Sequence, residues 1–317
     1  MVAKEWYSPL LRFVGIGKKN YLKAGHAALV LIEKSRGDIE YHDFGRYITP
    51  EPNGRVRSAA HDRELAFSVK AKIVDGKIQN LDEILIFLAN NPKLTHGEGK
   101  LVASVCDEVN YQEARNHINK LISRGSFRYA AFIRDACNCA RFVTTTLIAS
   151  VTNSAIKKKL NKSTKFTPST VGNVVIANTG DQVYEVNGIE VKEFTSTVRK
   201  ENLRCFLDKL PGHQPSFIGT TLPKEVEGLA STAKWLGGIA SGAWYEFTSA
   251  KSLGNSEYRF RRISPYGNID IDSVFTDESG EFNLNIEFEI KHDSNCAFCT
   301  VIQQQKTIIL KYSRDFN

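Results

Sequence analysis

Apolar residues form an almost continuous run at residues 27–33, Ala-Ala-Leu-Val-Leu-Ile-Glu. Such a run predicts a strand near the centre of a sheet, because a strand buried on both faces loses the usual alternation. Residues 35–38 (Ser-Arg-Gly-Asp) are typical of a turn, and a second strand is predicted from Ile39 to Phe44. Further strands are predicted at residues 69–74, 174–178 and 182–186.

Helical spacing of apolar residues marks three segments: residues 81–90, residues 108–123 and the stretch that follows Cys139. In the third, Val143, Leu147 and Val151 recur every four residues. Three consecutive threonines at 144–146 form helices poorly, so this helix must be held by packing rather than by propensity.

Beyond about residue 205 the pattern changes to a period of two, most clearly at residues 282–290 (Phe-Asn-Leu-Asn-Ile-Glu-Phe-Glu-Ile). A turn at 277–280 separates that segment from residues 269–275, which predicts a hairpin, and a last strand is expected at 307–312. Pro211, Gly212 and Pro215 form a linker-like stretch. We therefore predict an α+β domain over residues 1–205, with an antiparallel sheet packed on helices, and a β-rich accessory domain over residues 206–317.

Composition is that of a globular protein, with 317 residues of which 42% are hydrophobic and 24% charged. The first residues lack the apolar core of a secretory signal, and no stretch reaches the roughly 18 apolar residues of a membrane span. We therefore expect a cytoplasmic protein, unless it is exported by a machine that reads no such signal.

Charge is unevenly distributed along the chain. Of 42 Lys/Arg and 35 Asp/Glu, residues 206–317 hold 11 and 14, which leaves 31 and 21 for residues 1–205, a balance of +10. We interpret this basic N-terminal part as a solvated surface, with binding of an anionic partner such as a phospholipid surface, a nucleic acid or an acidic protein as the alternative. The chain has no zinc finger, Walker A loop or RNP-like motif, so we disfavour nucleic acid.

Six cysteines are present, and in a cytosolic chain they are expected as free thiols. Cys296 and Cys299 form a lone C-x-x-C, and no second Cys/His pair has the spacing of a zinc site. We therefore expect neither a metal nor a cofactor.

The feature with the clearest chemistry is Cys139, which stands where the third helix begins. A thiol with an ordinary pKa near 8.5 is mostly protonated at neutral pH, and a helix N-terminus and a nearby imidazolium both favour the thiolate. His26 precedes the first predicted strand, in Gly-His-Ala-Ala-Leu-Val at 25–30. A buried small hydrophobe and a structural histidine are the alternative interpretations of these two residues. Arg141 is interpreted as a surface or pocket-lining charge, with an anion clamp as the alternative.

Residues 138–143 (Asn-Cys-Ala-Arg-Phe-Val) resemble the Asn-Cys-Glu-His-Phe-Val signature of the lecithin:retinol acyltransferase-like proteins at four of six positions. Those proteins belong to the circularly permuted, NlpC-type branch of the papain-like cysteine hydrolases, in which the catalytic His precedes the Cys. The resemblance covers about residues 1–190. It implies a permuted papain-like fold, with Cys139 as nucleophile and His26 as general base and acid. Ala140 and Arg141 replace the Glu-His of the signature, so the substrate of those relatives is not carried over.

A third polar residue should orient the imidazole, and the resemblance implies His42, on the following strand. If the chain turns near residues 35–37, His42 lies about four residues from His26, on the order of 13 Å at the strand rise. That is too far for a direct hydrogen bond. Asp43, Tyr47 and His96 remain the alternatives.

These observations predict a cysteine-dependent hydrolase or acyltransferase that works through a Cys139 thioester. Its substrate would be a peptide, an isopeptide, a glutamine amide or a lipid ester. Because no export signal is present, wall peptides rank below a cytoplasmic substrate. The alternative is a non-catalytic binding protein that keeps a papain-like shell and recognises a partner with its β-rich tail.

Overall fold

The computed structural model describes Leu10 and residues 25–96, 99–207, 222–223, 225–239 and 241–316. The chain forms two compact units, each assembled from separate segments. Unit 1 draws on residues 1–45, 67–124 and 128–219, and unit 2 on residues 46–66, 125–127 and 220–317. The linker-like residues Pro211, Gly212 and Pro215 lie outside the described part of the chain.

Unit 1 mixes helices with short antiparallel strands. Its strands are β1 (Ala28–Glu33), β2 (Asp38–Gly45), β4 (Ile73–Val74), β5 (Lys77–Ile78), β6 (Leu101–Ala103), β8 (Tyr184–Asn187) and β9 (Glu190–Glu193). Its helices are α2 (Leu81–Ala89), α3 (Pro92–Thr95), α4 (Tyr111–Ser123), α5 (Cys139–Ser150), α6 (Ser154–Ser163), α7 (Thr170–Ala177) and α8 (Val198–Leu207). The short strand β7 (Phe127–Arg128) joins residues of both units.

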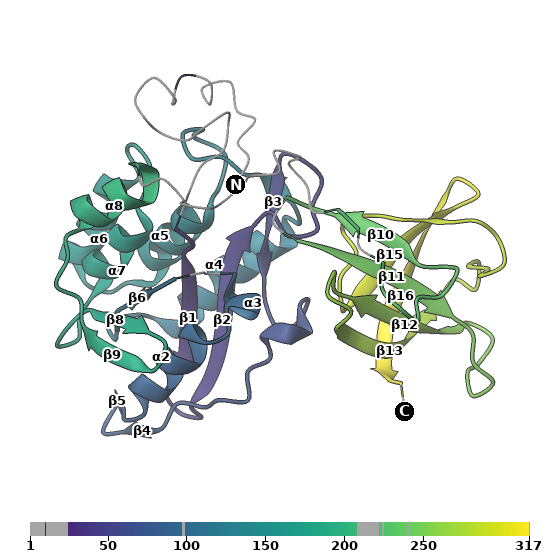
Figure 1. Ribbon diagram of the computed structural model, residues 1–317, viewed down its shortest axis with the longest axis horizontal. Helices are drawn as coiled ribbons and strands as arrows, with labels where there is room; N and C mark the ends of the chain where they lie inside the picture. Colours follow the sequence, from purple (N-terminus) through teal and green to yellow (C-terminus); the bar gives the residue numbers. More distant parts are fainter. Residues whose placement is uncertain are drawn as a thin grey trace. The chain divides into compact units, whose positions relative to one another are not determined.

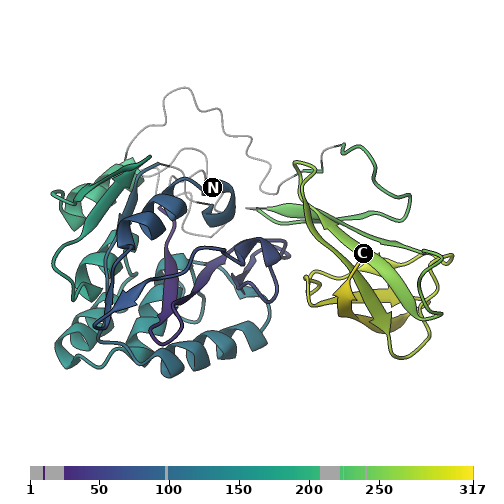
Figure 2. The same cartoon turned by 90° about the horizontal axis from the view of Figure 1, so that it is seen from below.

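The hairpin β1–β2 is the framework on which the candidate site is built. Its strands pair antiparallel, with Ala28 opposite Asp43 and Glu33 opposite Asp38. The turn needs Gly37, whose φ is +70° and where a Cβ atom would lie 2.1 Å from the carbonyl oxygen of Ala71. Helices α4 and α5 contact β1, and α5 also contacts β2, so the hairpin is covered by helices (Figures 1 and 2).

One predicted strand of unit 1 is a helix. Residues 174–178 form the last turn of α7 and its C-cap, Asn178. The Oγ atom of Ser169 accepts a hydrogen bond from the N–H of Gly172, which caps the helix five residues before the predicted strand. The β-branched residues at 174–176 suggested a strand, but the cap at Ser169 starts a helix that includes them. The predicted strand at 69–74 is also shortened, to β4.

Unit 2 is dominated by one antiparallel sheet of seven strands in the order β10-β11-β12-β13-β16-β15-β14. The two end strands, β10 and β14, contact each other, so the sheet curls almost into a barrel. Its interior is aromatic, with Phe247 against Phe260, Phe282 and Phe288. The elements of unit 2 are β3 (Asn53–Arg57), η2 (Arg63–Leu65), β10 (Lys234–Gly237), β11 (Gly242–Thr248), β12 (Glu257–Ile263), β13 (Ile269–Asp277), β14 (Glu289–Ile290), β15 (Phe298–Gln303) and β16 (Lys306–Asp315).

The hairpin predicted from the alternation at 282–290 is wrong. Strand β13 pairs with β12 and β16 instead, and only Glu289 and Ile290 of the predicted strand pair with a neighbour. Phe282, Phe288 and Ile290 are buried as expected. The backbone between them is held by the side chain of Gln303, which donates to the carbonyls of Asn283 and Ile286 at 2.8 and 2.9 Å. The alternation of buried and exposed residues at 282–290 therefore comes from an irregular segment whose backbone is held by the Gln303 side chain.

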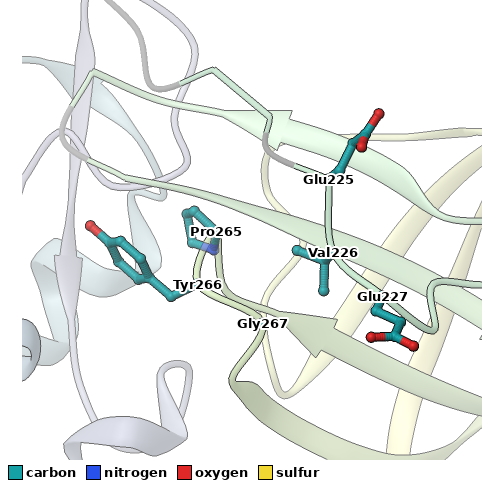
Figure 3. Close-up of a pocket in the computed structure, with 6 residues that line it drawn as sticks. All are labelled: Glu225, Val226, Glu227, Pro265, Tyr266 and Gly267. Carbon is teal, nitrogen blue, oxygen red and sulfur yellow. The ribbon is translucent and has the colours of Figure 1, made fainter.

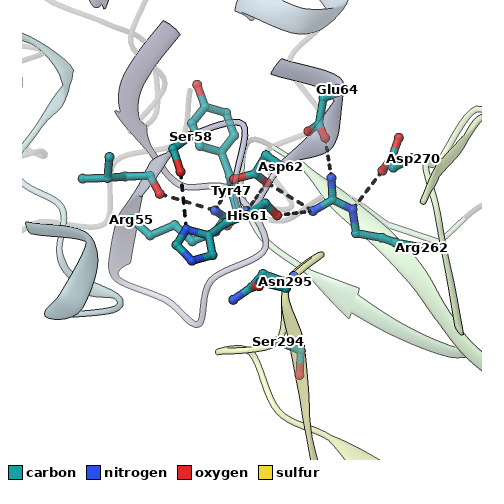
Figure 4. Close-up of polar contacts among 12 residues, drawn as sticks. Tyr47, Arg55, Ser58, His61, Asp62, Glu64, Arg262, Asp270, Ser294 and Asn295 are labelled. Atoms are coloured by element: carbon teal, nitrogen blue, oxygen red, sulfur yellow. Dashed lines mark hydrogen bonds and ion pairs between the residues drawn. The ribbon is translucent and has the colours of Figure 1, made fainter. Parts of the chain in front are cut away.

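A buried ionic cluster also stabilises unit 2 (Figure 4). The guanidinium of Arg262, only 1% exposed, donates to Asp62, Glu64 and Asp270 at 3.1, 2.5 and 3.0 Å. Arg55 binds both carboxylate oxygens of Asp62 at 2.7 Å. The cluster joins β3, the loop before η2, β12 and β13, and its charges are paired internally, which is the condition for burying them.

Mixed helices and antiparallel sheets confirm the predicted α+β class, and the β-rich C-terminal region is confirmed as well. Among the described residues, no helix combines the length and apolar character needed to cross a bilayer.

Candidate active site

Cys139 is the first residue of α5 because Asn138 caps the helix. The backbone of Asn138 is extended, with φ −145° and ψ 174°, and its Oδ1 accepts a hydrogen bond of 2.8 Å from the N–H of Arg141. The free N–H groups of the first turn give this end of the helix a partial positive charge. The thiol of Cys139, 7% exposed, lies at that charge.

Helix α5 is stable despite its threonine run because the hydroxyls have internal partners. Thr144 donates to the carbonyl of Ala140 at 2.8 Å and lies 2.7 Å from Oδ1 of Asn173, and Thr146 donates to the carbonyl of Phe142 at 2.9 Å. Asn173 of α7 also donates to the carbonyl of Ala140 at 2.8 Å. Packing and side-chain hydrogen bonds therefore fix the helix that presents Cys139.

His26 lies two residues before β1 and meets a carboxylate on β2. Its Nε2 is 2.8 Å from Oδ2 of Asp43, which is completely buried, whereas the His26 side chain is 19% exposed. The hydroxyl of Tyr41, on the same face of β2 two residues earlier, lies 3.2 Å from the same carboxylate oxygen. Asp43 is thus held between a phenol and an imidazole.

His26 and Cys139 also influence each other's ionisation, and each shifts the pKa of the other toward its charged form. Burial opposes the charged imidazolium, but the hydrogen bonds with Asp43 and Cys139 outweigh it and raise the pKa of His26 to about 9. Burial likewise opposes the thiolate, yet the hydrogen bond and charge of His26 lower the pKa of Cys139. The two shifts favour a thiolate–imidazolium pair at neutral pH.

Further groups surround the sulfur of Cys139. The hydroxyl of Tyr129 lies 3.8 Å from Sγ, and the carbonyl oxygen of Gly25 also lies at 3.8 Å. The backbone N–H of Ala27 also contributes to the lowered pKa of Cys139. Tyr129, in the irregular segment before α5, was missed by the sequence analysis, because no pattern of apolar residues or spacing marks it.

Arg141 anchors the segment that precedes Cys139. Its guanidinium donates to the backbone carbonyls of Ala131 at 2.8 Å, of Ile133 at 2.6 Å and of Ala136. Three of the five N–H donors of this guanidinium are thus used within the chain, which favours a structural role for Arg141 over an anion clamp. Arg141 instead determines the course of the chain from Tyr129 to Cys139.

The remaining predicted residues lie elsewhere. His42 stands opposite Leu29, and its Nε2 lies 3.3 Å from Oε2 of Glu40. Successive side chains of a strand point to opposite faces, so β2 presents Asp43, and not His42, to His26. Of the two predicted residues, the structure therefore places Asp43 beside His26, whereas His42 contacts Glu40.

The last two alternatives, Tyr47 and His96, follow the ends of two elements of the fold, β2 and α3. Tyr47 belongs to unit 2, where the guanidinium of Arg57 lies 3.9 Å from its ring centroid. His96 follows α3 in a left-handed conformation, with φ 53°.

Cys139 is distinct among the thiols that the structure describes. Burial raises the pKa of Cys106 and Cys296 to about 11 and that of Cys137 and Cys299 to about 12, whereas that of Cys139 is lowered. All five are free. Among the described residues, no group of three or more His, Cys, Asp and Glu side chains has the arrangement of a metal site.

A separate pocket of about 500 Å³ lies in unit 2 (Figure 3). It is lined by Glu225, Val226, Glu227, Pro265, Tyr266 and Gly267. The carboxylates of Glu225 and Glu227 point in different directions, so they do not converge on a common ligand (Figure 3).

Comparison with known protein families adds two similarities. Residues 1–156 match the family described as type VI secretion system effector TseH-like, and residues 233–313 match the DUF6695 C-terminal domain. The first match spans His26, Asp43 and Cys139 and is consistent with a papain-like fold. Neither curated proteins nor solved structures give a match.

Proposed function

We propose that unit 1 is a cysteine hydrolase in which Cys139 is the nucleophile, His26 the general base and acid, and Asp43 the residue that orients His26. One observation supports this assignment above the others: the imidazole that lies 2.8 Å from a buried carboxylate is also the group that lowers the pKa of Cys139, the one described thiol with a lowered pKa. The carboxylate holds Nε2, which leaves Nδ1 for the sulfur.

The reaction follows from these contacts. The thiolate of Cys139 attacks the carbonyl carbon of an amide or ester, and N–H groups of the first turn of α5 stabilise the oxyanion. The imidazolium of His26 gives its proton to the leaving amine or alcohol, and an acyl-thioester of Cys139 remains. His26, now neutral, takes a proton from water as its oxygen attacks the thioester. The C–S bond breaks, the acid is released, and the thiolate–imidazolium pair is restored. An amine or alcohol in place of water would give acyl transfer.

The order His26, Asp43, Cys139 along the chain supports a permuted papain-like arrangement of the NlpC type. A carboxylate as third residue departs from the second histidine implied by the lecithin:retinol acyltransferase-like signature. We therefore propose the wider NlpC-type superfamily and do not extend the proposal to that branch.

The substrate we propose is an amide, in a peptide or isopeptide, with a lipid ester as the second choice. The similarity of residues 1–156 to secretion effectors supports action outside the producing cell, where wall peptides are available. Wall peptides therefore rank with cytoplasmic amides as candidate substrates.

Alkylation with iodoacetamide at neutral pH, followed by mapping of the adduct, tests the chemistry. We expect Cys139 to react first, about tenfold or more faster than in a His26→Ala variant, because an ordinary thiol is only a few per cent ionised at pH 7. A Cys137→Ser variant is the matched control and should react like the unmodified protein. Slow labelling of Cys139 that does not depend on His26 would favour the non-catalytic binding protein.

A further inference from the structure

The surface around α6 differs in charge from the rest of the chain. Residues 136–180 contain no Asp or Glu, while α6 and the residue pair after it contribute five lysines. All five side chains are exposed: Lys157, Lys158, Lys159, Lys162 and Lys165. The acidic residue that precedes this stretch is Asp135. Its charge is balanced by the adjacent, exposed Arg134, so it does not offset the charge of the lysines.

Exposed lysines elsewhere in the described chain are often paired. Lys70 lies 3.0 Å from Asp38, Lys306 lies 2.6 Å from Glu281, and Lys311 lies 2.9 Å from Glu278. The five lysines of the α6 region form no ion pair with a described residue. Their positive field is therefore available to an external anion.

Two exposed aromatic side chains accompany these lysines. Phe166, which follows Lys165 directly, is 74% exposed, and Phe132 is 41% exposed. Their ring centroids lie 5.0 Å apart with the planes inclined at 46°. Phe132 belongs to the segment that Arg141 ties to α5, so this aromatic pair joins the lysines to the segment that leads into Cys139.

We propose that the lysines of α6 and the pair Phe132–Phe166 form a docking surface for the headgroups of an anionic phospholipid bilayer. Lysines attract the negative surface, and apolar rings enter the boundary between headgroups and acyl chains. Helix α6 would lie on the membrane without entering it, because its apolar residues Ile156 and Leu160 are buried in unit 1. Figure 1 shows α6 grouped with α7 and α8 at one side of that unit.

Nucleic acid is the less favoured partner for this surface. Bases stack on free aromatic faces and often on guanidinium planes. Here the two rings contact each other, and the exposed cations of α6 are all lysines. Binding at this surface does not depend on the chemistry at Cys139.

Vesicle flotation with the full chain tests the proposal. A Cys139→Ala variant should bind vesicles of equal parts phosphatidylglycerol and phosphatidylcholine, bind phosphatidylcholine alone much less, and dissociate at high salt. The double variant Lys158→Gln/Lys162→Gln should bind about fivefold more weakly per removed lysine. Its matched control is Lys306→Gln/Lys311→Gln, which removes two exposed lysines that already pair with glutamates. This control should leave vesicle binding unchanged.

The aromatic contribution has its own control. Phe166→Ser should weaken vesicle binding about tenfold, whereas Ile189→Ser, at a side chain that is 82% exposed, should not. Equal binding to neutral and anionic vesicles, no binding to either, or binding of a single-stranded oligonucleotide in place of vesicles would each overturn the proposal. Because Cys139→Ala is used throughout, these outcomes are separate from a failure of the proposed hydrolase activity.

Discussion

Nε2 of His26, two residues before β1, lies 2.8 Å from Oδ2 of Asp43 on β2, although the two residues are 17 positions apart in the chain. The antiparallel register that places Ala28 opposite Asp43 brings them together. A fully buried carboxylate at this distance holds the imidazole in one orientation and favours its charged form.

Replacing Asp43 by Asn should reduce alkylation of Cys139 at neutral pH about tenfold and hydrolysis about 100-fold or more. The amide keeps the shape of the side chain but removes the charge that raises the pKa of His26. His42→Asn is the matched control on the neighbouring position of β2. It should leave both rates within about threefold of the unmodified protein, and a loss equal to that of Asp43→Asn would contradict our assignment.

The rate of Cys139 alkylation should depend on pH in two steps. The rate rises as the thiol ionises, at a pH below the ordinary thiol pKa because His26 lowers the pKa of Cys139. The alkylation rate then stays level until about pH 9, where loss of the proton from the His26 imidazolium produces the second step. Hydrolysis needs that proton, so it should decline above about pH 9.

The His26→Ala variant serves as the reference for this profile, and its labelling should show one step at a higher pH. Cys137, whose pKa burial raises to about 12, should stay unlabelled at neutral pH in both proteins. A wild-type profile with a single step near the ordinary thiol value would show that no ion pair forms.

Arg141→Lys should slow alkylation of Cys139 several-fold while leaving the two pKa values of the profile in place. A lysine keeps the charge but cannot hold the carbonyls of Ala131, Ile133 and Ala136 at once. The expected change is therefore in the placement of the thiol and of Tyr129. Lys120→Arg, a cation exchange on the exposed face of α4, is the control, and an equal effect there would argue against a positioning role.

Sequence patterns predicted the hairpin well because β1 is an apolar run and the turn has its own signature. They could not choose between His42 and Asp43, since adjacent residues of one strand differ only in the face they occupy. The position of His26 relative to β1 decides that face, and it depends on three-dimensional register. Tyr129 reaches the sulfur from an irregular segment, for which no periodicity exists.

Two errors in the predicted elements have one physical origin. The β-branched residues of 174–178 and the alternation of 282–290 are both typical of strands. Each segment takes its structure from one side chain outside it, the cap Ser169 and the buried amide of Gln303. A local pattern records which residues are buried, whereas the backbone conformation depends on where its hydrogen-bonding groups find partners.

Asp270→Asn should change how the stability of unit 2 depends on pH. Burial raises the pKa of Asp270 to about 6, helped by the nearby carboxylates of Glu64 and Asp62 and opposed by Arg262. A carboxyl whose pKa is raised on folding binds its proton more tightly in the native state. Its contribution to stability is therefore complete below its ordinary pKa and is lost as the pH rises through about 6.

Asp62 acts in the opposite sense, because Arg55 and Arg262 outweigh burial and lower its pKa, so its contribution is lost only in acid. The variant lacks the Asp270 titration, so the free energy of unfolding should fall less between pH 4 and pH 7 than in the unmodified protein, by about 1–3 kcal/mol. Fluorescence of Trp235 and Trp244, which contact each other in the same sheet, reports the unfolding of this unit. Asp272→Asn, which removes the partner of Arg259 on the same strand, is the matched control. Parallel pH profiles for the unmodified protein and Asp270→Asn would show that Asp270 titrates alike in the folded and unfolded chain.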